Sequence, residues 1–197
     1  MYDKTPREVL SEFYKANNLE FDGGETSKSV KIELSAKFHF YFPNFDARRK
    51  AVVKHDIHHI LTGYETTVAG ESEISAWEIA SGCRDCWVAF FIDTSGFMLG
   101  LLINFRGVLK AFARGRKTRN LYHNIFTTHH ALDMSIDELR FKLYLDKYPK
   151  DSKVSFVDLL LFAAFSVFGL IYSVALVAFL PFIFFYSLYI MISKSSK

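Results

Sequence analysis

Four residues in the run HDIHHILTGYETTVAGE combine the side-chain types and the spacing of a metal site: His55, Asp56, His59 and Glu71. On an α-helix, His59 lies about 40° around the axis from His55 and Asp56 lies about 100° from it, so these side chains can lean over one side of a turn. Two imidazoles and two carboxylates suit zinc, with iron or manganese as alternatives, and can leave a position open for substrate or water. We therefore expect this motif to bind a divalent metal.

A second element has to bring Glu71 to the helix that carries the histidines. Eleven residues separate His59 from Glu71, and Gly63 and Gly70 lie among them. The first helix is therefore expected to end, the chain to turn, and a second helix to begin with Glu71. Glu78 follows seven residues later on nearly the same helix face. It is the candidate catalytic group, which could orient a ligand histidine or handle a proton.

The two cysteines, Cys83 and Cys86, form a single CxxC pair. A structural zinc ribbon would need a second pair, and a thioredoxin-like redox site would need a βαβ context. We expect ordinary interior or helix-face thiols without a disulfide framework, which fits a reducing cytoplasm.

The metal motif resembles the hallmark of the Coq4 family of ubiquinone-biosynthesis proteins. That hallmark is HDxxH, eleven residues and then Glu, and this chain matches every fixed position of it. The resemblance covers roughly residues 5 to 147 and is strongest at the motif. Further matching positions are Thr66, Thr67, Gly70, Trp77, Glu78, Gly115-Arg116-Lys117 and Glu138-Leu139-Arg140.

The resemblance implies an all-α metal-binding domain over residues 1–150 that works at a membrane surface on a polyprenylated aromatic acid. In the family, the metal site is linked to removal of the ring's C1 carboxylate, coupled to hydroxylation at that carbon. We therefore expect a metal-dependent decarboxylase of a polyprenylated benzoate. The alternative is a non-catalytic scaffold that binds prenyl lipids and organises other quinone-biosynthesis enzymes. In either role the chain could also form a homo-oligomer.

Residues 154–193 form a hydrophobic C-terminal segment, in which residues 159–193 contain no charge. As one helix that stretch would be roughly 50 Å long, well beyond a hydrocarbon core of about 30 Å. We therefore expect a transmembrane helical hairpin that folds back between about residues 170 and 175, with one tilted span kinked near Pro181 as the alternative. Lysines flank the segment at both ends and favour both ends on the cytoplasmic side. We expect an integral membrane protein whose globular domain is cytoplasmic.

The overall charge is balanced, whereas one internal segment is strongly basic. The formal net charge is +3, from 24 basic and 21 acidic side chains, which argues against a nucleic-acid partner. Between Asp93 and Asp133 there is no acidic residue, and anionic lipid headgroups are the expected partner of the cations there. The first 18 residues are partly acidic without an apolar stretch, so no export signal is expected. The cations of the basic segment are Arg106, Lys110, Arg114, Arg116, Lys117 and Arg119.

Helical periodicity and turn residues predict the elements around the motif. Thr5-Pro6 followed by Glu8 is typical of a helix start, and a helix is expected as far as about residue 18. Further helices are expected over about residues 46–61, 71–81 and 135–148, and residues 86–105 form an apolar run typical of a core. Residues 30–42 partly alternate, which fits an extended strand or an irregular stretch.

Two other enzyme classes use similar histidine patterns. His55-Asp56 also matches the HD pair of metal-dependent phosphohydrolases, but that pattern leaves the second histidine and the glutamate of the motif unexplained. Its further ligands would be His39 and either Asp85 or Asp93.

Membrane desaturases offer the other pattern, an HxxHH box. His55, His58 and His59 match that box, and His129-His130 could belong to another. Those enzymes place spanning helices before and between their boxes, whereas every histidine here precedes the hydrophobic segment. Both alternatives therefore rank below the Coq4-like interpretation.

Overall fold

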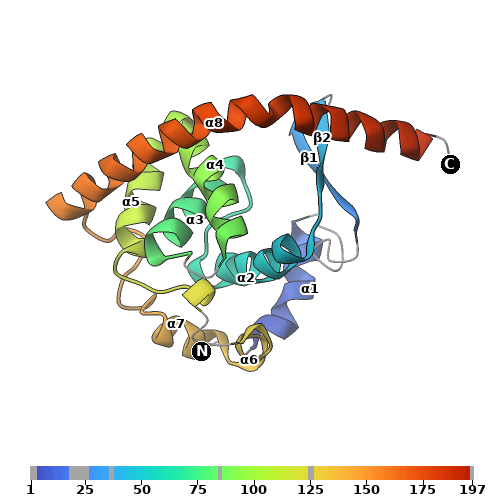
Figure 1. The fold of residues 1–197 in the computed structure, drawn as a ribbon. Coiled ribbons are helices and arrows are strands. Elements are labelled where there is room, and N and C mark those ends of the chain that lie inside the picture. Colours follow the sequence, from blue (N-terminus) through green and yellow to red (C-terminus); the bar gives the residue numbers. More distant parts are fainter. Residues whose placement is uncertain (1–3, 18–26, 36–37, 84–85, 124–126, 196–197) are drawn as a thin grey trace.

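The protein is a mostly helical domain crossed by a long C-terminal helix (Figure 1). This computed structural model describes residues 4–17, 27–35, 38–83, 86–123 and 127–195. The predicted helical character is confirmed. The helices are α1 (Pro6–Ala16), α2 (Asp46–Thr62), α3 (Val68–Ser81), α4 (Trp87–Ile103), α5 (Phe105–Gly115), the 3-10 turn η1 (Leu121–His123), α6 (Thr128–Asp133), α7 (Ile136–Lys142) and α8 (Phe156–Ser195).

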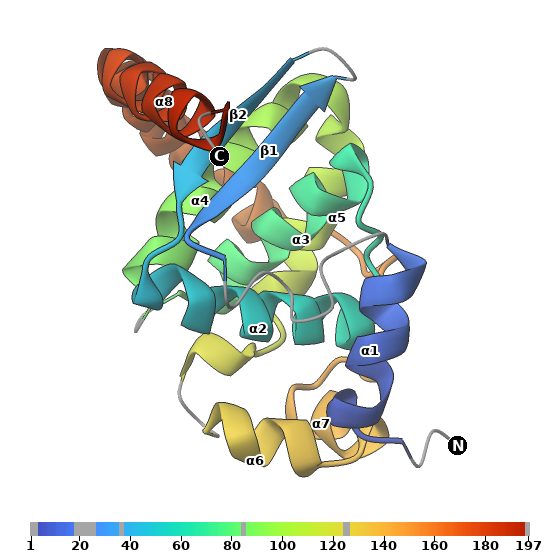
Figure 2. The same cartoon turned by 90° about the vertical axis from the view of Figure 1, so that its right-hand side faces the viewer.

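A two-stranded antiparallel hairpin departs from the predicted all-α class. Strands β1 (Ser29–Ser35) and β2 (Phe38–Pro43) pair in a register that places Val30 opposite Phe42. The alternating stretch 30–42 therefore supplies two paired strands, where the sequence predicts at most one. Figure 2 shows the hairpin reaching up to α8, which β2 contacts.

Side-chain caps fix where α1 and α3 begin. α1 starts with a capping box, in which Thr5 and Glu8 each accept the other's backbone N–H. Thr67 caps α3, which starts at Val68, almost one turn earlier than predicted. Glu71 therefore lies in the first turn of α3, where the helix dipole favours a carboxylate.

α3 forms the centre of the domain, packed between α4 and α5. Its Ile74 and Trp77 side chains are fully buried, and the Trp77 indole N–H donates to the Thr118 hydroxyl at 2.8 Å. Gly100 of α4 lies so close to α3 that an added Cβ would clash with the Ser72 side chain. Because α3 also carries Glu71, the packing of the core positions the candidate site.

Asn104 divides the apolar run of residues 86–105 between two helices. Its side-chain oxygen accepts the N–H of Gly107 and caps α5, while its own N–H closes α4 on the Gly100 carbonyl. The run predicted from composition as one core stretch therefore forms α4 and the start of α5.

Cations from later in the chain hold the C-terminal end of α2. They donate to carbonyls that have no partner inside the helix, and they complement the negative end of its dipole. Because Arg114 is buried, it serves the fold rather than the predicted basic surface. The donor and acceptor residues are Arg114 with Thr62, Arg140 with Leu61, and Lys150 with Gly63.

Acids distant in sequence neutralise part of the basic segment. Lys110 pairs with Asp151 at 2.7 Å. Arg116 and Lys117 lie 3.5 and 3.2 Å from Asp158, a buried carboxylate at the start of α8. The expectation of uncompensated cations is therefore wrong for these residues, because their partners come from beyond the segment.

The C-terminal segment is one continuous helix rather than the predicted hairpin. α8 runs through residues 170–175 without a turn and continues through Pro181. The stretch LIYSVA there contains no glycine or proline that would favour reversal. Within α8, Phe156–Phe179 is long and apolar enough to cross a membrane.

Phe162 anchors α8 in the domain core. Its side chain is 3% exposed, and its ring centroid lies 5.3 Å from that of Phe97 and 5.5 Å from that of Phe112. Phe162→Ala should lower the free energy of unfolding by about 3–5 kcal/mol in a denaturant titration of detergent-solubilised protein. Phe156→Ala is the matched control, because that ring is exposed, and should change it by less than about 0.5 kcal/mol. Equal losses in both variants would contradict the docking of α8.

Candidate metal centre

Side chains of α2 and α3 converge on one point. His55 Nε2 lies 3.1 Å from His59 Nε2. The Glu71 carboxylate oxygens lie 3.3 Å from both of these nitrogens. The histidines stand one turn apart on α2, and Glu71 comes from the first turn of α3. The structure thus brings together His55, His59 and Glu71, as the motif predicts.

The second nitrogen of each histidine fixes its tautomer. His55 Nδ1 lies 3.0 and 3.1 Å from the two oxygens of Glu78. His59 Nδ1 lies 2.9 Å from the Tyr64 carbonyl oxygen. Because carboxylates and carbonyls only accept hydrogen bonds, both Nδ1 atoms carry the proton and donate. In the neutral rings the Nε2 lone pairs therefore face Glu71, which is the arrangement a metal ligand requires.

The spacing of these atoms fits the ligand shell of a small divalent cation. In a tetrahedral zinc site with bonds of about 2.0–2.1 Å, the ligand atoms lie about 3.3–3.4 Å apart. The separations of 3.1–3.3 Å among His55, His59 and Glu71 are close to that value. These residues could hold a divalent metal ion.

Asp56 lies beside this group but does not join it. Two groups of described residues converge within 4.8 Å, and neither includes Asp56. One is His55, His59 and Glu71, and the other is His55, Glu78 and Asp93. Asp56 is buried and bonds with Tyr14, and its Oδ2 atom has no hydrogen-bond partner in the described structure. Burial raises the pKa of Asp56 to about 6, against the attraction of His55. Its role as a fourth ligand stays a prediction, with one carboxylate oxygen free to serve it.

Glu78 is a fully buried carboxylate behind the ligand histidines. It accepts hydrogen bonds from His55 and from His58, whose Nδ1 lies 2.5 Å away, and the Tyr122 hydroxyl donates to it at 3.4 Å. Burial opposes its ionisation, but the two histidines outweigh that effect and hold the pKa of Glu78 below its usual range. Glu78 contacts the face of His55 turned away from Glu71. These contacts place Glu78 where it positions His55, and its role in handling a proton stays a prediction.

Charge balance in the group favours a cation. Burial alone would raise the pKa of Glu71, but in the protonated, metal-free rings the Nε2–H groups of His55 and His59 donate to it and lower that pKa to about 2. Burial alone would lower the pKa of His55, yet the charges of Glu78 and Glu71 raise it well above its ordinary value. Two carboxylates around the imidazoles thus attract positive charge at this point.

His58 ties the site to the next part of the chain. Its Nε2 accepts the backbone N–H of Leu121 at 2.9 Å, so its Nδ1 must carry the proton given to Glu78. The ring packs against Trp77 and Tyr122, with centroids 5.1 Å away, and burial lowers its pKa. The HDxxH pattern assigns this residue no role. The one feature of the sequence that could have indicated a role for His58 was its position as the middle histidine of HxxHH.

Asp93 and Cys83 extend the buried network below Glu78. Burial, reinforced by the Glu78 charge, raises the pKa of Asp93 well above its ordinary value, and the Asp93 carboxyl bonds with Glu78. The Cys83 thiol lies 3.6 Å from Asp93, and burial raises its pKa. Cys83 and Cys86 are free thiols, as predicted. Asp93, singled out in the sequence as the lone charge of its apolar run, thus supports the positioning carboxylate.

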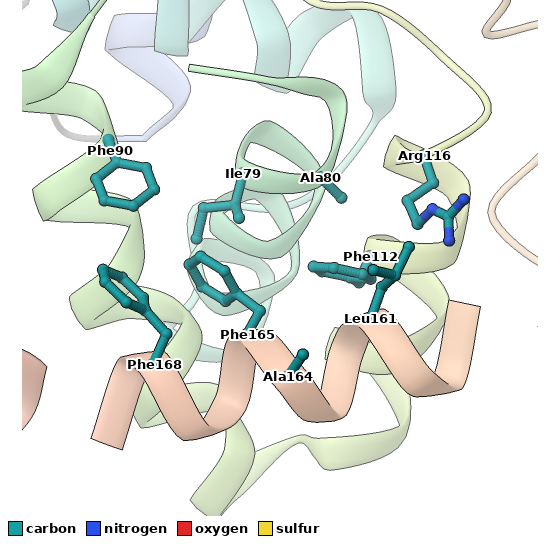
Figure 3. A pocket seen from close by; sticks show the side chains of 9 residues that line it. All are labelled: Ile79, Ala80, Phe90, Phe112, Arg116, Leu161, Ala164, Phe165 and Phe168. Atoms are coloured by element: carbon teal, nitrogen blue, oxygen red, sulfur yellow. The ribbon is translucent and has the colours of Figure 1, made fainter. Parts of the chain in front are cut away.

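An apolar cavity lies between the domain and α8, and Figure 3 shows it. Its volume is about 470 Å³. Side chains of α8 project toward α3 and α5, and Arg116 stands at one edge as the charged member of the lining. The lining residues are Ile79, Ala80, Phe90, Phe112, Arg116, Leu161, Ala164, Phe165 and Phe168.

The alternative histidine patterns gain no support from the described residues. Asp93 belongs to the network under Glu78, whereas Asp85 and the His39 side chain lie outside the described part of the structure. His129 and His130 are exposed on α6 and do not belong to the group of His55, His59 and Glu71 among the residues described.

Comparison with known proteins adds no assignment. No protein-family model, no curated protein and no solved structure matches this chain. The functional argument therefore depends on the geometry of the site and on the sequence motif.

The His58 contacts predict a stability difference between two histidines. His58→Phe removes a hydrogen bond to the buried Glu78 charge and leaves the Leu121 N–H unpaired, so the free energy of unfolding should fall by about 2–4 kcal/mol. His129→Phe, at an exposed ring, should change it by less than about 0.5 kcal/mol. Denaturant titration of both variants measures the difference. Loss of less than about 0.5 kcal/mol for His58→Phe would contradict the assigned network.

Proposed function

We propose that this protein is a Coq4-like, membrane-attached metalloenzyme of quinone biosynthesis that removes the C1 carboxylate of a polyprenylated aromatic acid. The observation that carries the proposal is the convergence of His55 Nε2, His59 Nε2 and the Glu71 carboxylate from two helices. The match to the HDxxH and Glu motif points from that geometry to the Coq4 family. The donor set favours zinc, with iron or manganese as alternatives.

The residues of the site fit a divalent cation. His55, His59 and Glu71 would hold it, and the unpartnered Oδ2 of Asp56 offers a further donor beside them. When bound, the cation supplies Lewis-acid polarisation of the substrate's carboxylate or ring oxygen. The chemistry of the donors, all nitrogen or oxygen, suits an open catalytic site better than a closed thiolate site.

The protein's own residues prepare this site in two ways. Glu78 and the Tyr64 carbonyl hold the rings of His55 and His59 in the tautomer that directs Nε2 toward the site. Phe13 of α1 stacks on His59 with a centroid distance of 5.8 Å and forms an apolar wall suited to an aromatic ring. The Glu71 side chain is 42% exposed, so substrate can approach from its side.

The proposed reaction breaks the bond between ring carbon C1 and the carboxylate carbon. Carbon dioxide leaves, and the electron pair stays on C1. Hydroxylation of C1 then takes one oxygen atom from dioxygen, while a two-electron donor reduces the other oxygen atom to water. The role of the site is to stabilise the charge that develops as the carboxylate departs.

Features of the C-terminal part support a lipid-soluble substrate. α8 is long and apolar enough for membrane attachment, with the domain proposed to lie on the cytoplasmic side. The cavity of about 470 Å³ between α8 and the domain is lined by aromatic and aliphatic side chains, which suit part of a polyprenyl tail. Ile79 on its wall adjoins Glu78 in α3, so the cavity and the metal centre share one helix.

A non-catalytic scaffold is the alternative function. The apolar cavity favours it, because that cavity could present a prenylated intermediate to partner enzymes without any chemistry at the metal centre. In that role the metal would stabilise the packing of α2 on α3. The two functions differ in whether carbon dioxide is released.

Metal analysis tests the ligands. Protein purified in detergent should carry about one metal ion per chain, and His55→Ala and Glu71→Ala should each lose most of it, because a shell that lacks one donor binds weakly. Glu65→Ala, at an exposed position between the two helices, is the control and should keep its metal. Unchanged metal content in the ligand variants would overturn the proposed site.

Substrate turnover tests the reaction. The metal-loaded protein in lipid vesicles, supplied with dioxygen and a two-electron donor, should release labelled carbon dioxide from a prenylated hydroxybenzoate that carries ¹³C in its carboxylate, whereas His59→Ala should not. Mass spectrometry detects the gas and the hydroxylated product. Stoichiometric metal and co-purifying prenyl lipid without any release would favour the scaffold.

Glu78→Gln tests the positioning role. The amide keeps the shape of the side chain but loses the negative charge, and its NH₂ group replaces the acceptor oxygen that faces His55 and Tyr122, so metal affinity should fall about 10–100-fold. Competition with a chromophoric chelator measures the affinity. Glu73→Gln, on the same helix and bonded to Asn104, is the matched control and should retain wild-type affinity. Equal affinities in the two variants would exclude a role for Glu78 at the site.

A further inference from the structure

α8 packs lengthwise on the domain from Phe162 to Ser187. Near its start Phe162 is inserted in the core, and farther along the Tyr172 hydroxyl donates to the Phe91 carbonyl of α4 at 3.0 Å. Toward its end, the backbone N–H of Tyr41 in β2 donates to Ser187 Oγ at 3.1 Å. At 1.5 Å per residue, this docked stretch is about 37 Å long.

Five polar side chains of α8 lie on the face turned to the domain, whereas Tyr189 and Ser193 are exposed. Asp158 and Ser187 are buried, and Ser166, Tyr172 and Ser173 are half-buried. Their spacing follows the helical repeat, so they form one stripe along the helix. Ser166 and Ser173 donate to carbonyls one turn earlier in α8 itself. Tyr172 and Ser187 bond with α4 and β2, and Asp158 pairs with Arg116 and Lys117, so these three polar groups hold this face of α8 on the domain.

The remaining faces of α8 are exposed and apolar. The described side chains there include many large aliphatic and aromatic residues, and residues 159–193 contain no charge. The domain adds exposed rings beside them, because Phe91 stacks on Tyr172 and Phe105 lies edge-on to Phe162. Exposed apolar side chains of α8 include Val167, Leu170, Ile171, Val174, Val177, Phe182 and Phe185. This surface is far larger than the isolated apolar residues usual on a soluble protein.

We infer that α8 lies in the plane of a membrane as a monotopic attachment surface and does not cross the bilayer. A hydrocarbon core is about 30 Å thick, which is shorter than the docked stretch of about 37 Å. An upright α8 would therefore force the β1–β2 hairpin and the α5 contacts of Phe162 to opposite sides of the membrane. In Figure 1 α8 runs across one side of the whole domain, as an in-plane helix must.

The occupant of this surface is a phospholipid bilayer that contains anionic lipid. With α8 in plane, its apolar faces enter the acyl region while its polar stripe stays on the domain. In the sequence, Lys153 precedes the apolar stretch and Lys194 follows it, so each end of the helix supplies a cation that anionic headgroups would attract. Arg106, next to the exposed Phe105, adds a cation on the same part of the domain surface.

A depth profile tests the orientation. Nitroxide labels on single cysteines, in a Cys83→Ala and Cys86→Ala background, are placed along the outward face of α8 in vesicles of phosphatidylcholine and phosphatidylglycerol. Accessibility to oxygen and to a polar nickel complex then reports depth. All positions should lie at one shallow depth. A depth that reaches its maximum at the bilayer centre would overturn the inference. A single span would show one such maximum along the helix, and a hairpin would show two. The labelled variants are Leu160→Cys, Leu170→Cys, Val177→Cys and Phe185→Cys.

A second measurement leaves the native cysteines in place. Epitope tags at the two ends of the otherwise unchanged protein should be cut by protease from the same side of sealed vesicles. Protection of one tag alone would show a crossing helix and overturn the inference.

A matched pair of tyrosine variants tests the docking itself. Tyr172→Ala removes the hydrogen bond to α4 and the contact with Phe91, so the labels beyond it should lose their uniform depth. Tyr189→Ala, at an exposed ring, should leave the profile unchanged. The same profile in both variants would contradict docking as the cause of the orientation. The inference goes beyond the proposed function and does not depend on the metal, so metal binding can succeed or fail independently of it.

Discussion

The buried negative charge of Glu78 is the interaction on which the site depends. A carboxylate with no exposed surface is costly unless hydrogen bonds compensate it, and here His55, His58 and Tyr122 provide them. Those donors come from α2 and from the turn after α5, whereas the acceptor comes from α3. The compensation of one charge therefore fixes three parts of the chain relative to one another. The same hydrogen bonds orient the ring nitrogen that faces Glu71.

α3 connects this site to the cavity beneath α8. One side of the helix carries Glu71 and Glu78, and its Ile79 and Ala80 line the cavity under α8. Trp77 lies between these two groups of residues in the sequence, and its fully buried side chain holds the helix in the core. A movement of α8 would therefore first displace the cavity wall. Because α3 is a single rigid helix, it would then displace the carboxylates of Glu71 and Glu78.

Local periodicity explains what could be predicted from the sequence. The spacing of His55 and His59 predicted that both lie on one helix face. Glu71 was predicted to join them because a new helix begins after the turn. These three residues of the site could therefore be predicted from the sequence. The role of His58 was not, because its partner, the Leu121 N–H, lies 63 residues away. Asp56 shows the same limit, since helical spacing allows it to reach the site but does not determine which way its carboxylate turns.

Tertiary contacts explain what the sequence left open in the fold. The length of the apolar segment argued for a hairpin, yet Phe162, Tyr172 and Ser187 contact the domain along one continuous helix. The sequence suggested that the cations of the basic segment have no acidic partners. Their partners, Asp151 and Asp158, come later in the chain. The paired strands likewise depend on contacts with α8, which is more than a hundred residues away.

The capped end of α2 bears on the timing of biosynthesis. The carbonyls of Leu61 and Gly63 accept hydrogen bonds from Arg140 and Lys150. These donors lie 79 and 87 residues farther along the chain. At about 5–20 residues per second, a ribosome needs roughly 4–17 seconds to deliver those donors. The helix that carries the histidines thus gains its final support only when most of the chain has emerged. The arrangement of His55, His59 and Glu71 is therefore completed late in synthesis, close to the moment when α8 leaves the ribosome.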